Sequence, residues 1–349
     1  MKEIKCAVIG SGVIAPVHIE SYQQIPGVSV KTLCDLIPEK AAKLAEKYAV
    51  PNTCTDYMEI LNDPEIDCVS ICTDHASHGR IAADAIDHGK HVLCEKCLTA
   101  TDEQLQWALD AHKRHPEVKF SGIFQHRLEP SNILLKKMIE QGDFGKILTA
   151  SLHVSCLRTN EYYETDPWRG TWAQEGGSVL INQSIHHFDL LRYFFGDIQS
   201  IYASMDNLVH QGVIETEDTL HALLTFKNGA RVSFNATSGS KAATWRSGYF
   251  ITGTEGYMEY AEFKPAYWKF TNEKIAQDLK EKFDACEDDL KITAGKTYYG
   301  TAHPAQIVDF IDAVRQDRLP FVTGEEAGET ARAVHACYES AKTGKLIEL

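Results

Sequence analysis

The sequence contains no apolar run that approaches the roughly 18 residues needed to cross a membrane. Residues 1–5 lead directly into a short apolar strand, without the longer apolar core of a signal peptide. Positive charge is scarce, because 35 Lys and Arg face 49 Asp and Glu, giving a formal net charge of −14 with no compensating basic cluster. This balance argues against nucleic acid or an anionic membrane as a partner. We expect a cytoplasmic protein that acts on a small, neutral molecule.

Metal-binding patterns are also missing. The chain has no H-E-x-x-H, and its 15 histidines are scattered along it. Most of the 10 cysteines lie inside apolar runs, where cysteine behaves as a small buried hydrophobe. Cys94 and Cys97 match C-x-x-C, so a redox or zinc role is the alternative, although no second C-x-x-C completes a four-cysteine zinc site. We predict reduced thiols and no catalytic metal.

A chain of 349 residues exceeds what one hydrophobic core usually fills, so we predict an α/β protein of two domains. Short β-rich runs alternate with helical patterns over residues 1–123, which is typical of a doubly wound, parallel Rossmann sheet. Strands are expected at Ile4–Ile9, Val28–Cys34, Cys68–Cys72, His91–Cys94 and Val118–Ile123, with helices at Pro38–Tyr48 and Thr101–His115.

Residues 124–349 predict an α+β domain with a large, mostly antiparallel open sheet. Asn228 and Gly229 separate two strand patterns and tolerate positive φ, so we predict a hairpin with a type I′ turn there. Helices are expected at Ser131–Gln141, Gly177–Phe195, Pro304–Arg315 and Gly324–Lys342, the last two either within this domain or packed back on the first.

The pattern Gly10-x-Gly12-x-x-Ala15 directly follows the first strand and precedes a helical pattern. In that context Gly10 permits a tight turn, Gly12 lets the backbone approach a pyrophosphate, and Ala15 lets helix and strand pack closely. The phosphates would lie at the helix N-terminus, with Val13 and Ile14 completing the expected cofactor loop.

Asp35 follows Ala15 by twenty residues, at the end of the second strand. A carboxylate there accepts hydrogen bonds from the adenosine ribose hydroxyls and would repel a 2′-phosphate. Neither Leu36 nor Ile37 offers a positive charge to such a phosphate. We therefore predict NAD(H) rather than NADP(H). The alternative is an aspartate that only forms a turn after the strand.

Polar residues also follow the next two strands, at 73–78 and at Glu95 and Lys96. Because ligands lie beyond the carboxyl ends of the strands in an open α/β sheet, cofactor and substrate are expected to meet at these loops. The alternative for Glu95 and Lys96 is a surface ion pair.

Three polar residues interrupt the apolar helix that follows Gly176-Gly177. Asn182, His186 and Asp189 fall at i, i+4 and i+7 and therefore share one face. A polar stripe on an apolar helix favours a face directed at a site over one directed at the core. His187 points about 100° away from His186, so we do not expect this pair to chelate one metal.

Segments spread over nearly the whole chain resemble the glucose-fructose oxidoreductase / inositol dehydrogenase / MocA (Gfo/Idh/MocA) family. They are Ala7–Gly12, Glu95–Lys96, Gly176–Gly177, Ile185–Asp189, His303–Phe310 and Tyr338–Lys345. The resemblance implies a Rossmann domain, a second α/β domain whose open sheet often forms subunit contacts, and an active site between the domains. It also implies a homodimer or homotetramer.

The resemblance further implies roles for single residues. Lys96 aligns with the catalytic or substrate-orienting lysine of the family's E-K-P motif, and Asn182 and His186 align with an Asp and a His that reach the substrate. His153 and Tyr299 are substrate candidates on the resemblance alone. Residues aligned with cofactor contacts are Thr73, Asp74, His78, Glu95, Lys96, Gln125 and Arg127.

Two positions depart from the family pattern. Cys97 replaces the proline, and because a non-proline cis peptide costs about 2.5 to 4 kcal/mol, we expect a trans bond between Lys96 and Cys97. Asn182 replaces the aspartate, and an amide can hydrogen-bond a hydroxyl but cannot accept its proton. Proton transfer then falls to His186 or Lys96.

We expect oxidation of a secondary hydroxyl on a sugar, glycoside (for example at C3) or cyclitol, with NAD(H) as cofactor. Because imidazole has an ordinary pKa of about 6.5 and lysine of about 10.4, His186 is expected as the base and Lys96 as the donor that polarises the hydroxyl. Tyr163, Trp168 and Arg169 lie in a loop that could form a sugar-binding wall, with domain packing as the alternative.

Two other functions stay open. NAD could be used redox-neutrally, in a glycosidase or lyase that passes through a transient keto-sugar. The chain could also be a non-enzymatic, dinucleotide-sensing regulator, although retention of both Lys96 and His186 argues against that.

Overall fold

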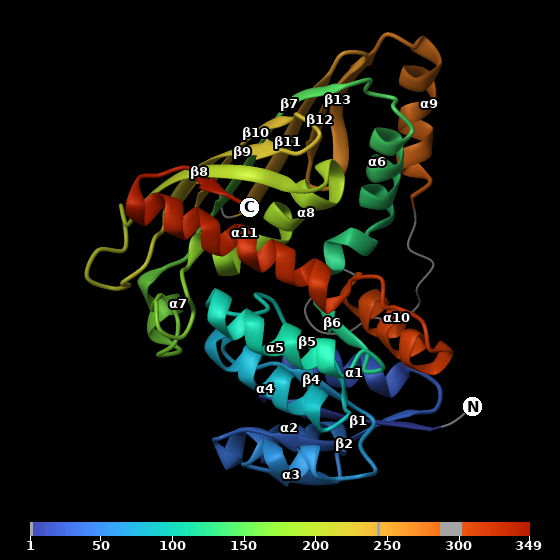
Figure 1. Cartoon of the computed structure of the whole chain (residues 1–349), viewed down its shortest axis with the longest axis vertical. Helices are drawn as coiled ribbons and strands as arrows, with labels where there is room; N and C mark the ends of the chain where they lie inside the picture. The colour runs from blue at the N-terminus through green and yellow to red at the C-terminus, as the bar shows by residue number, and fades with distance from the viewer. Residues whose placement is uncertain (1–2, 243–244, 287–301) are drawn as a thin grey trace. The chain divides into compact units, whose positions relative to one another are not determined.

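The computed structural model describes residues 3–242, 245–286 and 302–349 (Figure 1). The described residues form two compact units. Unit 1 comprises the residues up to 125 together with 302–331, and unit 2 comprises 126–286 together with 332–349. Within these ranges, no helix has both the length and the apolar character needed to cross a membrane.

Unit 1 contains a six-stranded parallel sheet in the order β3-β2-β1-β4-β5-β6. This strand order is the doubly wound Rossmann topology, so the predicted fold of the first half is confirmed. The strands are β1 (Ile4–Ile9), β2 (Val28–Cys34), β3 (Asn52–Cys54), β4 (Cys68–Ile71), β5 (His91–Cys94) and β6 (Phe120–Gly122). The helices are α1 (Ala15–Gln24), α2 (Pro38–Tyr48), α3 (Tyr57–Leu61), α4 (His75–Asp87), α5 (Asp102–Arg114) and α10 (Ala302–Gln316).

The core of unit 1 joins segments from both ends of the chain. α10 contributes Ile307, Phe310 and Ile311, which pack with Ile19 and Tyr22 of α1, and all five are fully buried. Burial of each such side chain stabilises the fold by roughly 1.5–3 kcal/mol relative to exposure. The helix that follows the glycine loop is therefore firmly anchored to the unit.

The register of the sheet brings the predicted site loops together. Ile9 pairs with Ile71, and Ile71 pairs with Cys94. The carboxyl ends of β1, β4 and β5 are thus neighbours, and the loops that begin at Gly10 and Glu95 lie at one edge of the sheet.

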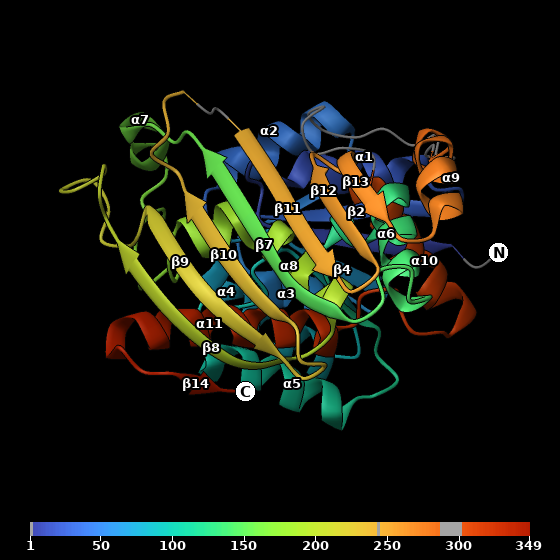
Figure 2. The same cartoon turned by 90° about the horizontal axis from the view of Figure 1, so that it is seen from above.

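Unit 2 contains an eight-stranded sheet in the order β13-β12-β11-β7-β10-β9-β8-β14 (Figure 2). All neighbours are antiparallel except β7 and β10, which confirms the predicted, mostly antiparallel sheet. The strands are β7 (Ile147–Cys156), β8 (Ile198–Asp206), β9 (Thr219–Phe226), β10 (Arg231–Thr237), β11 (Trp245–Gly253), β12 (Gly256–Ala261), β13 (Lys264–Phe270) and β14 (Ile347–Glu348). The helices are α6 (Pro130–Glu140), α7 (Asn160–Glu164), α8 (Ile185–Phe195) and α9 (Glu273–Asp284), and α11 (Gly324–Thr343) belongs to unit 2 from residue 332 onward.

Side chains of this second sheet alternate between two faces, as the pleat requires. One face is buried against α8, where the rings of Phe188 and Phe234 meet edge to face at 5.2 Å. The other face carries a continuous row of paired positions: Tyr202, Leu223, Ser233, Ser151, Phe250, Glu259 and Tyr267. The four large apolar members of this row have exposed fractions between 43% and 62%.

β9 and β10 form a hairpin at the predicted place, but the predicted type I′ turn is wrong. That turn needs positive φ at two successive residues. Gly229 has a φ of 93°, whereas Asn228 does not lie in the positive region. A backbone hydrogen bond of 3.0 Å between Phe226 and Ala230 closes a longer loop. Asn228 donates its side-chain N–H to the carbonyl of Phe195 at 2.9 Å, so a tertiary contact sets the conformation.

Candidate functional site

The glycine loop of unit 1 connects β1 to α1. Gly10 has a φ of 95°, and a Cβ at this position would lie 2.4 Å from the carbonyl oxygen of Cys72. Only glycine fits such a turn. A Cβ on Gly12, in contrast, would have no heavy atom of the described residues within 4 Å. The backbone of the loop therefore borders open space.

Several features of this loop suit a dinucleotide. α1 begins without a side-chain cap and without an acidic residue in its first turn, so its N-terminus favours an anion. Two buried oxygens of unit 1, Oγ of Ser11 and Oε1 of Gln125, have no hydrogen-bond partner among the described residues. Buried polar atoms need partners, and a bound ligand can supply them. The residues present thus fit a bound dinucleotide.

Asp35 is partly exposed at the end of β2. Its Oδ2 accepts a hydrogen bond of 2.8 Å from the backbone N–H of Ser11, and its Oδ1 accepts one of 2.9 Å from that of Ile37. The bond from Ile37 closes the turn expected of an aspartate after a strand. The bond from Ser11 fixes the carboxylate beside the glycine loop. Each oxygen retains capacity to accept a further hydrogen bond, as contact with a ribose requires.

The loop after β4 is tied to the loop after β5. Asp74 caps α4 by accepting hydrogen bonds from the N–H and the hydroxyl of Ser77, at 3.2 and 2.9 Å. The ring nitrogens of His78 lie 2.8 Å from the carbonyl oxygen of Cys97 and 3.2 Å from that of Thr73. Burial lowers the pKa of His78, so its neutral ring donates one proton, to the nearer carbonyl. His78 therefore joins these two loops.

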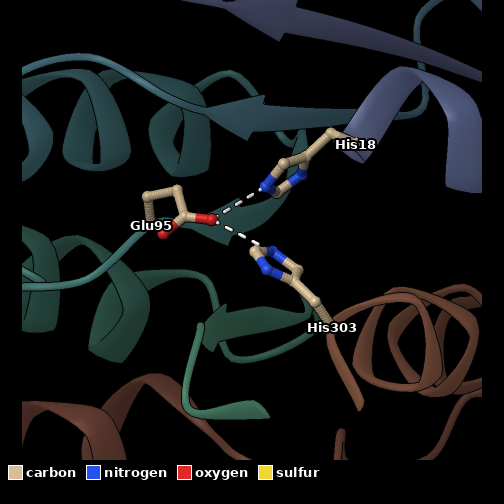
Figure 3. Close-up of side chains that lie close together, drawn as sticks. All are labelled: His18, Glu95 and His303. Atoms are coloured by element: carbon tan, nitrogen blue, oxygen red, sulfur yellow. Dashed lines mark hydrogen bonds and ion pairs between the residues drawn. The ribbon is translucent and has the colours of Figure 1, made fainter. Parts of the chain in front are cut away.

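Glu95 is held by two histidines from distant parts of the sequence (Figure 3). Its Oε1 lies 3.0 Å from Nε2 of His18 and 3.1 Å from Nε2 of His303. All three side chains are buried. Although burial alone raises the pKa of Glu95, the two imidazoles hold that pKa well below its ordinary value. The alternative of a surface ion pair between Glu95 and Lys96 is therefore wrong, because the Glu95 carboxylate lies inside unit 1.

Among the described residues, His18, Glu95 and His303 are a set whose ligand atoms lie close enough to hold a metal ion, within 4.8 Å of one another. The histidines are thus not all scattered, as the sequence suggested. Nδ1 of His18 lies 2.9 Å from the hydroxyl of Ser70, which lies 2.7 Å from that of Tyr22. Burial lowers the pKa of His18, and a neutral His18 that accepts from Ser70 donates its Nε2–H to Glu95. We interpret the cluster as a hydrogen-bonded support for the segment that carries Lys96.

The bond between Lys96 and Cys97 is cis, so the prediction of a trans peptide is wrong. The prediction considered only the local preference, whereas tertiary contacts fix this segment. Cys97 is fully buried, and its carbonyl accepts the hydrogen bond from His78. In the segment 92–100, Lys96 keeps partial exposure and all the remaining residues are buried. Lys96 is therefore the side chain of this segment that can reach a ligand.

The predicted helix over 177–195 begins instead with a π-helical turn, Val179–Ser184, which is continued by α8. The carboxylate of Glu217 accepts hydrogen bonds from the backbone N–H of Ser178 at 3.1 Å and from the hydroxyl of Tyr338 at 2.9 Å. A carboxylate at this end of a helix is favoured by the helix dipole. π-Turns are frequent at functional sites, and this one changes which residues share a face.

The predicted polar stripe holds for two of its three residues. Between residues 175 and 192, Asn182 and His186 alone are not buried. Asp189 is only 1% exposed and binds the guanidinium of Arg127 through two hydrogen bonds of 2.7 Å. Spacing for an ideal α-helix placed Asp189 on the exposed face, but an ion pair within unit 2 holds it inside.

The aromatic loop contains both packing and accessible residues. Tyr163 is buried, and its hydroxyl lies 3.0 and 3.2 Å from two serine hydroxyls, so the packing alternative describes it. The guanidinium of Arg169 lies 4.2 Å from the ring centre of Tyr162 and 5.1 Å from that of Trp168. Trp168 and Arg169 keep partial exposure and remain candidates for contact with a sugar.

His153 is not brought together with Asn182 and His186. It lies on the exposed face of β7, whereas its neighbours Leu152 and Val154 lie on the buried face that α8 covers. Side chains of successive strand residues point to opposite faces, so His153 points away from α8. The other substrate candidate from the resemblance, Tyr299, lies outside the described residues.

Two family descriptions match the chain. "Oxidoreductase family, NAD-binding Rossmann fold" matches residues 4–122, and "Oxidoreductase family, C-terminal alpha/beta domain" matches residues 136–349. The chain belongs to the Gfo/Idh/MocA family of NAD-dependent oxidoreductases. The resemblance stated from the motifs is thereby confirmed.

Members of the Gfo/Idh/MocA family similar to this chain act on sugars or cyclitols by name. The levoglucosan dehydrogenase of Pseudarthrobacter phenanthrenivorans is 26% identical over 338 residues, which cover 87% of this chain and 82% of that protein. The myo-inositol 2-dehydrogenase of Thermotoga maritima is 26% identical over 230 residues, which cover 65% and 66%. The crystal structure of the WlbA dehydrogenase from Bordetella pertussis, in complex with NADH and UDP-GlcNAcA, has a TM-score of 0.90 at 26% identity and covers 100% of this chain and 98% of that chain.

One residue that the sequence analysis missed contacts Asn182, the position where this Gfo/Idh/MocA member has an amide in place of the family's aspartate. Glu175, directly before the two glycines, is fully buried and accepts hydrogen bonds from the side-chain N–H of Asn182 and the backbone N–H of Gly170. Burial raises the pKa of Glu175 to about 7. The signal that could have found it is an acidic residue placed immediately before an apolar helix that begins with glycines.

Proposed function

We propose that this Gfo/Idh/MocA protein is an NAD(H)-dependent dehydrogenase that oxidises a secondary hydroxyl of a sugar, glycoside or cyclitol. The observation that carries the proposal is the pair Asn182 and His186. Between residues 175 and 192, these are the two side chains that keep partial exposure. Polar groups arranged in this way can bind and deprotonate a hydroxyl. The names of the relatives support sugars and cyclitols as the substrate class.

Each proposed residue has a separate role. Bound NAD⁺ would supply the hydride acceptor, held by the glycine loop and Asp35. His186 removes the hydroxyl proton through an imidazole nitrogen, and Lys96 donates a hydrogen bond to the same hydroxyl oxygen. Asn182 hydrogen-bonds a neighbouring hydroxyl, and Arg169 binds the ring's outer hydroxyls.

A panel of sugars, glycosides and inositols, each incubated with the protein and NAD⁺, tests the proposal. We expect NADH to accumulate with at least one member, followed by its absorbance. Product formation without any change in NADH would favour the redox-neutral glycosidase or lyase. Tight binding of NADH with no turnover on any member would favour the dinucleotide sensor. Either of these two results would contradict a dehydrogenase.

We also propose that the protein prefers NAD(H) to NADP(H), because the Asp35 carboxylate would repel a 2′-phosphate. Leu36 and Ile37, which follow it, are exposed and uncharged. A lost charge-assisted bond is worth about 1.5–3 kcal/mol, so we expect kcat/KM for NADP⁺ to be roughly 10- to 100-fold below that for NAD⁺. Equal kcat/KM values for the two cofactors would contradict this role of Asp35.

We further propose a homodimer or homotetramer formed through the exposed face of the sheet in unit 2. The row places Tyr202 beside Leu223 at one end and carries Phe250 and Tyr267, with Glu259 between them, at the other. Exposed large apolar side chains that share one face of a sheet are typical of interaction surfaces. Light scattering of the purified protein measures its mass, and a monomer at micromolar concentration would exclude this assembly.

A further inference from the structure

Glu175 and Asn182 form a carboxyl–amide pair at the start of the helix in unit 2. Oε1 of Glu175 accepts from Nδ2–H of Asn182, and Oε2 accepts from the backbone N–H of Gly170. Glu175 is fully buried, whereas Asn182 is partly exposed. The carboxyl therefore selects the orientation of the amide, because only its N–H end can bond to a carboxyl acceptor. The amide oxygen is then the end that can accept a hydrogen bond from a hydroxyl.

The surroundings of Glu175 balance its two protonation states. Burial raises the pKa of Glu175 to about 7, although the N–H groups of Gly170 and Asn182 and the charge of Arg169 favour the ionised form. The nearby carboxyl of Glu217 disfavours the ionised form and raises the pKa of Glu175 further. The charged and titratable groups that interact with Glu175 are Arg169, Glu217, Tyr162, Tyr163 and Tyr338. A small change of pH near neutrality thus changes the charge behind Asn182.

We propose that Glu175 is a positioning residue for hydroxyl oxidation, which acts through Asn182 and supplies the carboxylate that position 182 lacks. The ionised carboxylate holds the amide with its oxygen directed at a substrate hydroxyl. It also places a negative charge next to a group that contacts the substrate. No bond to Glu175 forms or breaks in the reaction. This inference rests on the dehydrogenase function proposed above.

Exchange of the two side chains tests the pair. E175Q removes the ionisable group at nearly constant size, and we expect kcat/KM for the sugar to fall roughly 10²-fold, as a misplaced catalytic contact costs. The double variant E175Q/N182D moves the carboxylate to position 182, and we expect its kcat/KM to return to within about tenfold of the wild type. E164Q is the matched control, because Glu164 is an exposed carboxylate in α7, close in sequence to Glu175.

A pH profile separates positioning from a purely structural role. Each group that must lose a proton adds one to the limiting slope of log kcat/KM on the acid side. Because protonated Glu175 should resemble E175Q and lower kcat/KM only roughly 10²-fold, we expect the slope of the wild type and E164Q to approach 2 over about two pH units below pH 7, and that of E175Q to be about 1. The inference is overturned if E175Q keeps the kcat/KM and slope of E164Q, or if the exchange variant is no more active than E175Q.

Thermal unfolding tests the buried carboxyl without any substrate. A carboxyl whose folded-state pKa is raised favours the folded state in its protonated form, so its stabilising effect is present below about pH 4 and is lost as pH rises to about 7. The midpoint temperature of unfolding of E175Q should therefore rise relative to that of the wild type as the pH increases from 5 to 8. A constant difference would contradict the raised pKa. A wild type that makes no NADH from any polyol would refute the proposed function instead, while this unfolding result would stand.

Discussion

Replacement of Asp189 by alanine is expected to lower the free energy of unfolding by about 3–5 kcal/mol, because it leaves the buried guanidinium of Arg127 without its carboxylate. The two side chains are 6% and 1% exposed and are joined by two hydrogen bonds of 2.7 Å. The ring of Tyr193, 5.5 Å from the guanidinium, cannot replace a negative charge. Unfolding of the wild type and D189A in guanidinium chloride measures the difference in unfolding free energy.

Two variants control this experiment. E140A removes the carboxylate of Glu140 in α6, which is 60% exposed and forms an ion pair with Lys136. We expect this variant to lose less than about 0.5 kcal/mol of unfolding free energy. R127M/D189L replaces the whole buried pair by apolar side chains and should be far more stable than D189A. If D189A unfolds at the same denaturant concentration as E140A, the ion pair does not stabilise unit 2.

R127M/D189L also examines the cofactor contact that the family resemblance implies for Arg127. In the structure the guanidinium is engaged by Asp189, so we expect KM for NAD⁺ to stay within about threefold of the wild-type value in this variant. A much larger KM, with stability retained, would show that Arg127 serves the cofactor as well.

Local patterns were sufficient for much of the fold. β1, β2, β5 and α2 have the bounds that strand and helix patterns predict, because each is a complete apolar or amphipathic run that ends at a turn. β3 was missed, since three residues, two of them exposed, leave no pattern to detect. The hairpin was found but its turn type was not, because Asn228 makes a contact with Phe195 that no local rule contains.

The candidate site shows the same division between local and distant information. The motif Gly10-x-Gly12 and the exposure of Asn182 and His186 follow from short segments of sequence. The partner of Asp189 does not, because Arg127 lies in a different segment and the π-turn breaks the helical spacing. Equally, nothing near position 95 in the sequence indicates the histidines that hold its carboxylate. Tertiary structure alone brings such partners together.

Replacement of Lys96 by methionine is expected to lower kcat by about 10²- to 10³-fold, the range typical of a lost hydrogen-bond donor to an oxygen that gains negative charge. Methionine keeps an unbranched chain of similar length but cannot donate a hydrogen bond to the substrate hydroxyl. Lys96 is the partly exposed residue of a buried segment that Glu95 and His78 support, so the substitution should leave that segment in place. The Kd for NADH, measured by fluorescence, should change by less than about threefold.

Lys40→Met is the matched control, because Lys40 is an exposed lysine of α2 in the same unit. An activity of K96M equal to that of K40M would exclude Lys96 from the reaction. A double-mutant cycle with H186N then asks whether both side chains serve one proton transfer. Residues that act as a unit show losses that do not add, so K96M/H186N should be little worse than the poorer single variant. Fully additive losses would mean that Lys96 and His186 act in separate steps.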